Sequence, residues 1–285
     1  MNRLTAIHVQ YGDRLRAGFR KYRKVFFLSW QEQLEYRANY FFESLIGVIS
    51  FLVLFFFWRA VYQSSHAHAI GGLSFQAMLS YLLLAKFWGW IIDPTVEIDT
   101  NLPEDIRNGG LNRFLTRPLS DRIYRFSQYL AHKLLYGAAR IGPFIAVVMF
   151  FPGLFHLPPR PGWWYLPLAC SLALVLQFVF SYAVALIAFW WLEIWGVLFL
   201  KRLIVGFLAG SWVPLTMLPA PAARILYMLP FQYMIFFPVQ IALGKVAAPD
   251  IVAGLWIQCV WIAVFLFLSK ILWAQGLKKY SGAGI

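Results

Sequence analysis

Long apolar runs alternate with shorter polar intervals along most of the chain. A helix needs about 20 apolar residues to cross a hydrocarbon core about 30 Å thick. Six runs approach or exceed that length, at about residues 42–62, 75–97, 134–154, 163–191, 201–218 and 251–273. They predict an all-α, polytopic membrane protein with six transmembrane helices. We expect one transmembrane domain over residues 1–285, with the spans in residues 42–273 and a tail at 274–285.

The first 41 residues precede these runs and carry an amphipathic pattern. Over residues 13–37, aromatic side chains recur at spacings of three and four, at Phe19, Tyr22, Phe26 and Trp30, and basic side chains fill much of the remainder. This pattern predicts a helix with one apolar face. It favours a helix that lies in the membrane interface. The alternative is that the apolar face packs on other parts of the protein.

Residues 219–249 are apolar, but five prolines interrupt them. Proline removes a backbone donor and breaks helices, so no continuous span fits this stretch. Non-helical backbone at membrane depth must be buried in protein or line a wet cavity. We therefore expect short re-entrant helices in the outer leaflet, between the fifth and sixth spans.

The longest polar interval, residues 97–124, separates the second and third apolar runs. Pro103 suits the first turn of a short helix, and the two acidic residues that follow it complement the positive end of that helix. Glycines at positions 109 and 110 end it. Ser120 or the aspartate after it is suited to cap the next helix. The interval therefore predicts a short helix between spans two and three.

The composition agrees with a membrane protein, because only 13% of the residues are charged against roughly 25% in soluble domains. The net charge is +13, and its placement gives the orientation. The side that holds both termini and residues 97–124 carries 19 of the 25 Lys and Arg residues, and the opposite side carries three. The positive-inside rule then places both termini and this interval in the cytoplasm. The distribution explains the basic charge without a nucleic-acid partner.

No convincing catalytic or metal-binding constellation occurs in the sequence. The five histidines are scattered, and His66 with His68 in one loop is weak evidence for a metal site. Cys170 and Cys259 lie inside apolar runs, which favours two buried small residues over a zinc site or a disulfide. We expect no catalytic residue, no bound metal and no cofactor in this chain.

Three charged residues are candidates for a substrate pathway, namely Lys86, Arg140 and Glu193. Lys86 and Arg140 lie at similar depth in their predicted helices, and a charge at such depth must face protein or water. They either meet an anionic or amphipathic substrate or pair with Asp93, Glu97 or Glu193 and orient the helices. The sequence favours pairing. A regular helix would also align Lys86, Asp93 and Glu97 on one face.

Residues 104–120, which read EDIRNGGLNRFLTRPLS, resemble a loop of a known family. The shared pattern is an acidic residue, Ile-Arg, Gly-x-Leu and a later Leu-x-Arg-Pro, matched here by residues 108–111 and 117–119. With the basic N-terminal helix, the six spans and the broken stretch before the last span, the chain is similar to type-2 exporter permeases of bacterial ATP-binding cassette transporters. The nearest branch is known as uncharacterised permease components. Residues 191–195 match a second family segment more loosely.

The resemblance implies a pair of permeases, identical or related, bound to a dimer of a separate cytoplasmic ATPase in the bacterial inner membrane and surrounded by its lipids. The chain has no G-x-x-x-x-G-K-[ST] loop, so ATP and Mg would be bound by that ATPase. In the family the short helix of the 97–124 loop docks in a cleft on the ATPase. We expect an exposed helix with an apolar point, and coupling carried by Glu104, Asp105, Ile106, Arg107, Leu111, Phe114 and Arg117.

Two other functions use some of the same features. A membrane-embedded enzyme acting on lipids needs a polar cluster at the interface, and only Asp93, Glu97, Asp99 and Glu193 come near one. A structural or assembly subunit needs no substrate. Co-purification of an ATPase separates the exporter from both. The apolar, aromatic interior admits lipids, drugs, glycolipids or hydrophobic peptides, and the export direction follows from the resemblance alone.

Overall fold

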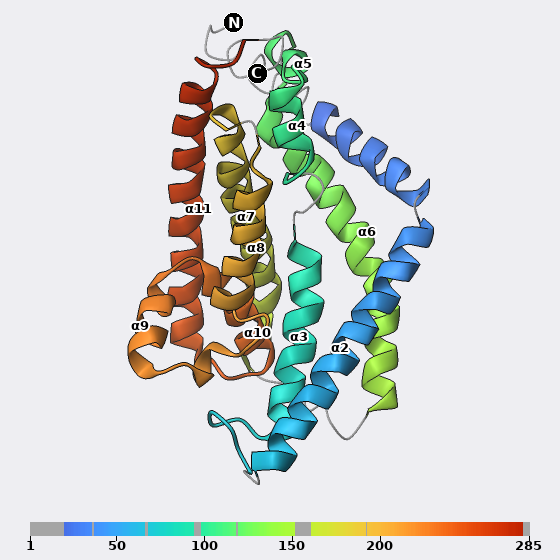
Figure 1. Cartoon of the computed structure of the whole chain (residues 1–285), viewed down its shortest axis with the longest axis vertical. Helices are drawn as coiled ribbons and strands as arrows, with labels where there is room; N and C mark the ends of the chain where they lie inside the picture. Colours follow the sequence, from blue (N-terminus) through green and yellow to red (C-terminus); the bar gives the residue numbers. More distant parts are fainter. Residues whose placement is uncertain are drawn as a thin grey trace, which may run out of the picture.

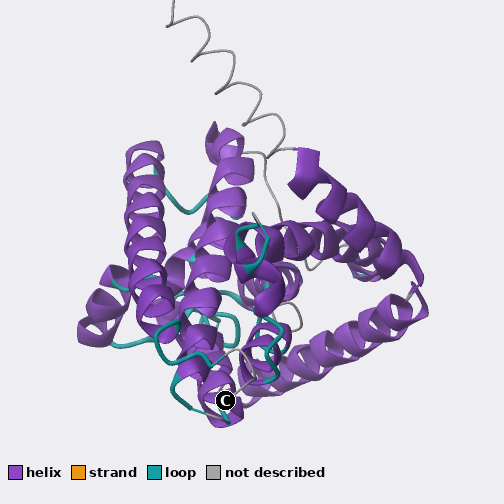
Figure 2. Ribbon diagram, turned by 90° about the horizontal axis from the view of Figure 1, so that it is seen from above, coloured by secondary structure: helices purple, strands orange, loops and turns teal. Residues whose placement is uncertain are grey.

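The computed structural model describes residues 20–35, 37–65, 68–93, 98–117, 119–151, 161–191 and 193–281. This part of the chain is built from helices (Figure 1), and the view from above shows helices joined by loops, with no strand (Figure 2). Within these ranges the only strand-like pairing is an isolated bridge between Ile70 and Leu73. The predicted all-α fold is confirmed.

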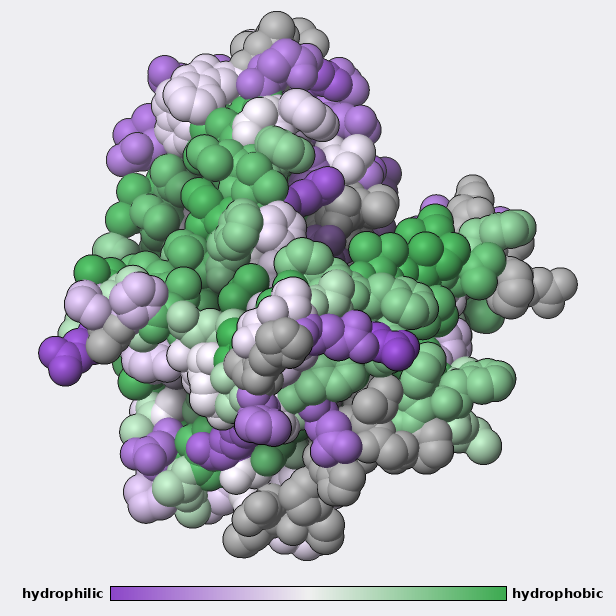
Figure 3. All heavy atoms as spheres, turned by 60° about the horizontal axis from the view of Figure 1, so that its bottom comes forward, coloured by the Kyte–Doolittle hydropathy of each residue, from purple (hydrophilic) through white to green (hydrophobic). Residues whose placement is uncertain are grey.

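Five helical segments are long and apolar enough to cross a membrane. They agree with the predicted first, second, third, fourth and sixth spans, although the ends differ, most at the third, where the helix begins at Asp121 and not near residue 134. The segments are Phe42–Ser65 of α2 (Arg37–Ser65), α3 (Phe75–Ile92), α6 (Asp121–Phe150), Gly162–Phe189 and α11 (Ala248–Gly276). Gly162–Phe189 joins the 3-10 helix η1 (Pro161–Tyr165), α7 (Leu166–Ala185) and the 3-10 helix η2 (Leu186–Phe189). Figure 3 shows hydrophobic residues covering broad areas of the surface between more hydrophilic ends.

The second span ends earlier than predicted. α3 ends at Ile92, and Asp93 has an extended backbone with φ −64° and ψ 115°. The reason is that a residue before proline is pushed out of the helical region, and Pro94 follows Asp93. The helical φ of Asp93 still places its side chain on the side of Lys86, and both residues line one hollow beside α3, as predicted. Glu97, the third member of that face, lies outside the described residues.

The fifth span does not form one continuous helix over residues 201–218. Instead α8 covers Trp195–Leu208, which is too short alone to cross about 30 Å of hydrocarbon. The chain turns after it at Gly210, whose φ of +80° favours glycine. The predicted broken stretch follows as α9 (Ala220–Met228), η4 (Phe231–Tyr233) and α10 (Phe236–Ala242). In the described part of the chain, five helical segments are thus long enough to span a membrane and α8 is shorter, so the sixth span stays a prediction.

The broken stretch is buried in protein, as its backbone requires. Phe236, Phe237 and Val239 of α10 belong to a core cluster that also contains residues of α3, α7 and α11. The Tyr81 hydroxyl of α3 donates a hydrogen bond to the Gly210 carbonyl at 2.6 Å, which satisfies the backbone where α8 has ended. The Trp88 indole N–H donates to the Met234 carbonyl at 2.8 Å. α3 therefore holds the non-helical segments in place.

A helix at residues 20–35 lies within the predicted amphipathic stretch and confirms its helical character there. Phe26 packs against Trp30, with ring centroids 5.9 Å apart. The Tyr22 hydroxyl accepts a hydrogen bond from the Ser120 backbone N–H at 2.9 Å, at the start of α6. This helix, the short helices after α3 and the end of α11 all lie toward the upper end of Figure 1. Its placement in the membrane interface stays a prediction.

Candidate functional site

The polar interval between α3 and α6 folds into two short helices, α4 (Asn101–Arg107) and α5 (Asn112–Leu115). Pro103 lies in the first turn of α4, where its missing N–H costs no hydrogen bond. Glu104 in the first turn and Arg107 in the last complement the dipole of the helix. Gly109, at φ +77°, reverses the chain after α4. The short helix was predicted from these same residues.

The apolar side of this segment packs on the chain itself. Ile106 and Leu111 are fully buried, and Phe114 is nearly so. Their cluster includes Phe189 of η2 and Leu198 of α8, and α4 packs on η2. The prediction of an exposed apolar point was wrong for these residues, because the chain's own 3-10 turn covers the face assigned to a partner. Burial makes them supports for the shape of the segment.

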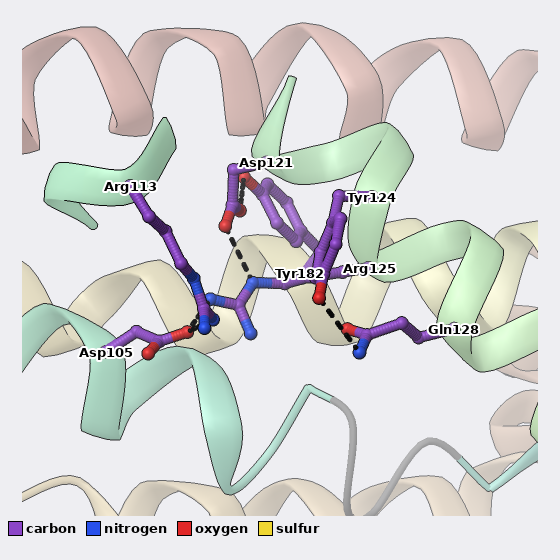
Figure 4. Close-up of polar contacts among 7 residues, drawn as sticks. All are labelled: Asp105, Arg113, Asp121, Tyr124, Arg125, Gln128 and Tyr182. Atoms are coloured by element: carbon purple, nitrogen blue, oxygen red, sulfur yellow. Dashed lines mark hydrogen bonds and ion pairs between the residues drawn. The ribbon is translucent and has the colours of Figure 1, made fainter. Parts of the chain in front are cut away.

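A charged network ties α4, α5, α6 and α7 together (Figure 4). One carboxylate oxygen of Asp105, Oδ2, lies 2.5 Å from Nη2 of Arg113 and 2.5 Å from Nη2 of Arg125. Arg125 also donates through Nε to Asp121 Oδ1 at 2.9 Å, and Asp121 Oδ2 accepts from the Tyr182 hydroxyl at 2.8 Å. Arg125 is 0% exposed. A buried guanidinium needs such partners, so Asp105 acts as an internal brace.

Gly110 allows the Asp105 carboxylate to reach the two arginines. A Cβ at position 110 would overlap Oδ1 of Asp105 and would lie 3.0 Å from its Cγ. The backbone of the Gly109-Gly110 turn therefore has two separate requirements. Gly109 supplies the positive φ, and Gly110 supplies the space for the carboxylate.

Arg107 points to a different partner. Its Nη1 lies 2.7 Å from Oε1 of Glu193, in the segment between η2 and α8. The side chains are 38% and 73% exposed. The sequence assigned Glu193 to a substrate pathway, but the structure brings it to the α4 segment, and it lines none of the described hollows that contain Lys86 or Arg140.

Several charged side chains of the segment remain accessible. Glu104, Arg113 and Arg117 are exposed, and Leu115 is the exposed apolar side chain among them. Beside them lies a hollow of about 340 Å³ whose walls include Phe114, Leu115, Arg122, Tyr182 and Trp273. Because the sequence predicts that this segment contacts an ATPase, we refer to Glu104, Arg107, Arg113, Leu115 and Arg117 as the docking residues. They present one carboxylate, three guanidinium groups and one apolar side chain on a braced frame.

A buried ion pair joins the start of this segment to α8. Lys201 Nζ lies 2.5 and 2.6 Å from the two carboxylate oxygens of Asp99 and 3.2 Å from the Ser181 hydroxyl. Arg202 Nε is 3.8 Å from the same carboxylate. Burial raises the pKa of the Asp99 carboxyl above its ordinary value, and the Lys201 ammonium opposes that shift. The pair fixes where the chain leaves α3 and enters α4.

Lys86 and Arg140, the two candidates within the spans, share a hollow. Both line a small space between α2, α3 and α6, together with Trp90. Arg140 Nη2 is 3.4 Å from Oε2 of Glu43, and its guanidinium lies over the rings of Trp90 and Tyr136 at 4.7 and 4.1 Å. Arg140 therefore pairs with an acid on α2 that the sequence analysis did not consider.

Sequence reasoning missed three functional residues of the network, Asp121 as a partner, Arg125 and Tyr182. Asp121 and Arg125 are four residues apart on a helix, a spacing that indicates an ion pair. The pairing of Asp121 with Arg125 was therefore predictable from the sequence. The contacts of Arg125 with Asp105 and of Tyr182 with Asp121 depend on how α6 and α7 pack, so they were not. No local pattern marks Asp99 and Lys201 as partners.

These features define a polytopic helical membrane protein whose one end carries a braced, charged segment between its second and third spans. Residues 48–284 match the family described as ABC-2 family transporter protein, and the chain belongs to that family. It is thus a transmembrane component of an ABC transporter and not its catalytic subunit, and the family implies association with an ABC ATPase component. No curated protein matches the chain significantly.

Proposed function

We propose that this chain is the permease subunit of an ATP-driven exporter in the bacterial cytoplasmic membrane, with both termini in the cytoplasm. Two such permeases, identical or related, form the translocation pathway. The pair couples to one dimer of a separate ATPase, which binds ATP and Mg. Membership of the ABC-2 family supports the permease assignment, and the excess of Lys and Arg on one side supports the orientation.

The docking residues support coupling through the α4 segment. A movement of the partner can be transmitted to the spans only if the segment it contacts is rigid. Here the short helices are linked to α6 and α7 by four residues, Asp105, Arg125, Asp121 and Tyr182. Asp99 and Lys201 link the same segment to α8. A push on α4 would therefore move three helices together. The single observation that carries the proposal is this buried bracing beneath exposed charges.

Co-purification tests the proposal. Tagged full-length chain, purified from its host, should retain an ABC ATPase that is identified by its nucleotide-binding peptide in mass spectrometry. The double variant Glu104→Ala/Arg107→Ala should lose most of that ATPase, because both side chains are accessible and neither belongs to the buried network. The matched control is Arg224→Ala, since Arg224 is exposed on α9 at the other end of the molecule (Figure 1). Retention of the ATPase by the double variant would contradict the assignment of the docking residues.

A further inference from the structure

Three hollows meet at Trp90, near the end of α3 that leads to α4. One, of about 220 Å³, lies between α3, α7 and α8 and is lined by Lys86, Gln177, Lys201 and Arg202 among others. A second, of about 320 Å³, lies between α2, α3 and α6 and is lined by Lys133 and Arg140 among others. The small space shared by Lys86 and Arg140 adjoins both. Trp90 lines all three.

The walls carry groups that lack a partner in the described part of the chain. Lys86 forms no hydrogen bond or ion pair there, and Lys133, only 5% exposed, rests on the rings of Tyr129 and Tyr136 without a carboxylate in ion-pair contact. Gln177 is 4% exposed, and its carboxamide oxygen has no hydrogen-bond partner, nor does Nε of the buried Arg140. Buried polar groups are normally satisfied by protein, water or ligand, so this concentration gives a bound molecule several groups to pair with.

The charges indicate the sign of that ligand. Of the acids near the hollows, Glu43 is held by Arg140 and Asp99 by Lys201, while Asp93 lies where the hollows meet. Five lysines and arginines line the three hollows, against the two carboxylates of Glu43 and Asp93. Among the described residues, neither Lys86 nor Lys133 is in ion-pair contact with a carboxylate. An organic cation would face both of these ammonium groups, whereas an anion would be attracted to them. The unpartnered atom of Gln177 is the carboxamide oxygen, which accepts from a ligand hydroxyl, while the NH2 group of the same carboxamide can donate to a phosphate oxygen beside it.

The apolar side chains around the hollows indicate that the ligand also has an apolar tail. The small central space has apolar walls, including Phe51, Phe87, Phe144 and Val147. The outward sides of α2 and α6 are apolar as well, with Ile49, Val53 and Ile145 exposed. A polar hollow that adjoins an apolar wall between spans fits a molecule with a charged head and a hydrocarbon chain, and does not fit a free small anion alone.

We propose that the hollows around Trp90 bind the phosphate headgroup of an anionic amphiphile, with Lys86 and Lys133 as its principal charge partners and Gln177 as a hydrogen-bonding partner. Binding of this amphiphile does not depend on the proposed exporter function. Its transport as cargo does, and that one step rests on the proposed function. A phosphate amphiphile could also come from the bilayer as a resident lipid. Both sources share the same headgroup chemistry.

Binding is tested first, without any ATPase. Full-length protein in neutral detergent is titrated with a fluorescent phosphatidate and with a diacylglycerol of the same chains and label. We expect tight binding of the phosphatidate only. Lys86→Gln/Lys133→Gln should weaken it by roughly tenfold or more, as expected when charge-assisted hydrogen bonds are lost. Lys86→Arg should retain binding, and the exposed Lys270→Gln on α11 is the matched control that should change nothing.

Equal affinity for phosphatidate and diacylglycerol, or unchanged binding by the double variant when it elutes as a single folded species, would overturn the site. If the double variant does not fold, Lys86→Gln alone is measured against Lys86→Arg, with the same outcomes.

Transport is tested separately, in vesicles that contain the complex with its ATPase. ATP-dependent movement of the phosphatidate, slowed by Lys86→Gln, supports the cargo assignment. Binding without such movement identifies a resident lipid and overturns that assignment, and an absent ATPase contradicts the proposed function while leaving the binding result intact.

Discussion

Arg107 and Glu193 are 86 residues apart in the sequence, yet Arg107 Nη1 lies 2.7 Å from Glu193 Oε1. The sequence placed these residues in separate roles, one in coupling and one in the pathway. The ion pair instead fastens α4 to the segment before α8. Because both side chains are substantially exposed, the pair contributes only about 0–1 kcal/mol to stability. Such a pair is easily exchanged for a contact with another protein.

A charge exchange separates the two possible roles of Arg107. Arg107→Glu should weaken the complex with the ATPase and change the melting temperature little. Arg107→Glu combined with Glu193→Arg restores an ion pair within the chain but leaves the wrong charge toward a partner. We expect the double variant to remain defective in ATPase co-purification. Recovery of the complex would show that Arg107 acts through Glu193 and does not touch the ATPase.

Asp105 should behave differently from its neighbour Glu104. Asp105→Asn removes the carboxylate that faces Arg113 and Arg125, and Arg125 is fully buried. Because Asp121 still pairs with Arg125 and Asp105 is partly exposed, we expect a loss of about 1–3 kcal/mol in unfolding free energy rather than the full cost of an unpaired buried charge. Glu104→Gln should cost almost nothing. Thermal unfolding in detergent compares the two, and equal melting temperatures would refute the bracing role of Asp105.

Gly110→Ala tests the same brace from the backbone side. The added Cβ would overlap Asp105 Oδ1 and crowd its Cγ and Cα, so the carboxylate must leave its arginines or the turn must shift. We expect destabilisation of about 1–3 kcal/mol. Gly142→Ala in α6 is the control, because a Cβ there meets nothing within 4 Å. Since alanine is the better helix former, that change should be neutral or stabilise by up to about 1 kcal/mol. Similar melting temperatures for both variants would exclude crowding at position 110.

Much of the fold was predictable because it depends on local chemistry. Apolar length located five spans, the prolines of residues 219–249 indicated the short helices, and the glycines at 109 and 110 located the end of α4. The end of α3 at Ile92 was also encoded locally, since Pro94 acts on Asp93, but the prediction carried the helix on to residue 97. The end of α8 could not be predicted from the apolar pattern, because apolar residues continue past Gly210 after the helix has ended.

The candidate site was predictable in position and less so in detail. Residues 104–120 carry a pattern that drew attention to the right segment. Which of its side chains face outward depends on η2, whose Phe189 packs in the same cluster as Ile106 and Leu111. Likewise, the partner of Arg140 is Glu43 on α2, a contact set by helix crossing and not by spacing along one helix. Long-range ion pairs need the packed structure before they can be assigned.

The buried pair of Asp99 and Lys201 gives a prediction with a pH dependence. Lys201→Met leaves the Asp99 carboxylate buried with only Arg202 nearby, at 3.8 Å. Breaking a buried ion pair on one side costs about 3–5 kcal/mol, so the variant should unfold at a much lower temperature near neutral pH.

The loss of stability in this variant should depend on pH. Burial raises the pKa of the Asp99 carboxyl, and without the Lys201 ammonium the positive charge that still opposes this shift is that of Arg202. A carboxyl whose pKa is raised by folding favours the folded state below its unfolded pKa of about 3.9 and loses that contribution as pH rises through the folded value. The loss of melting temperature in Lys201→Met should therefore shrink as the pH is lowered toward that range.

Asp99→Asn/Lys201→Met is the control, because it has no carboxyl to titrate at this position. Its melting temperature relative to the unmodified protein should exceed that of Lys201→Met at pH 8, with a smaller difference at pH 5. A deficit of Lys201→Met that is the same at both pH values would show that Asp99 is not the group left unpaired.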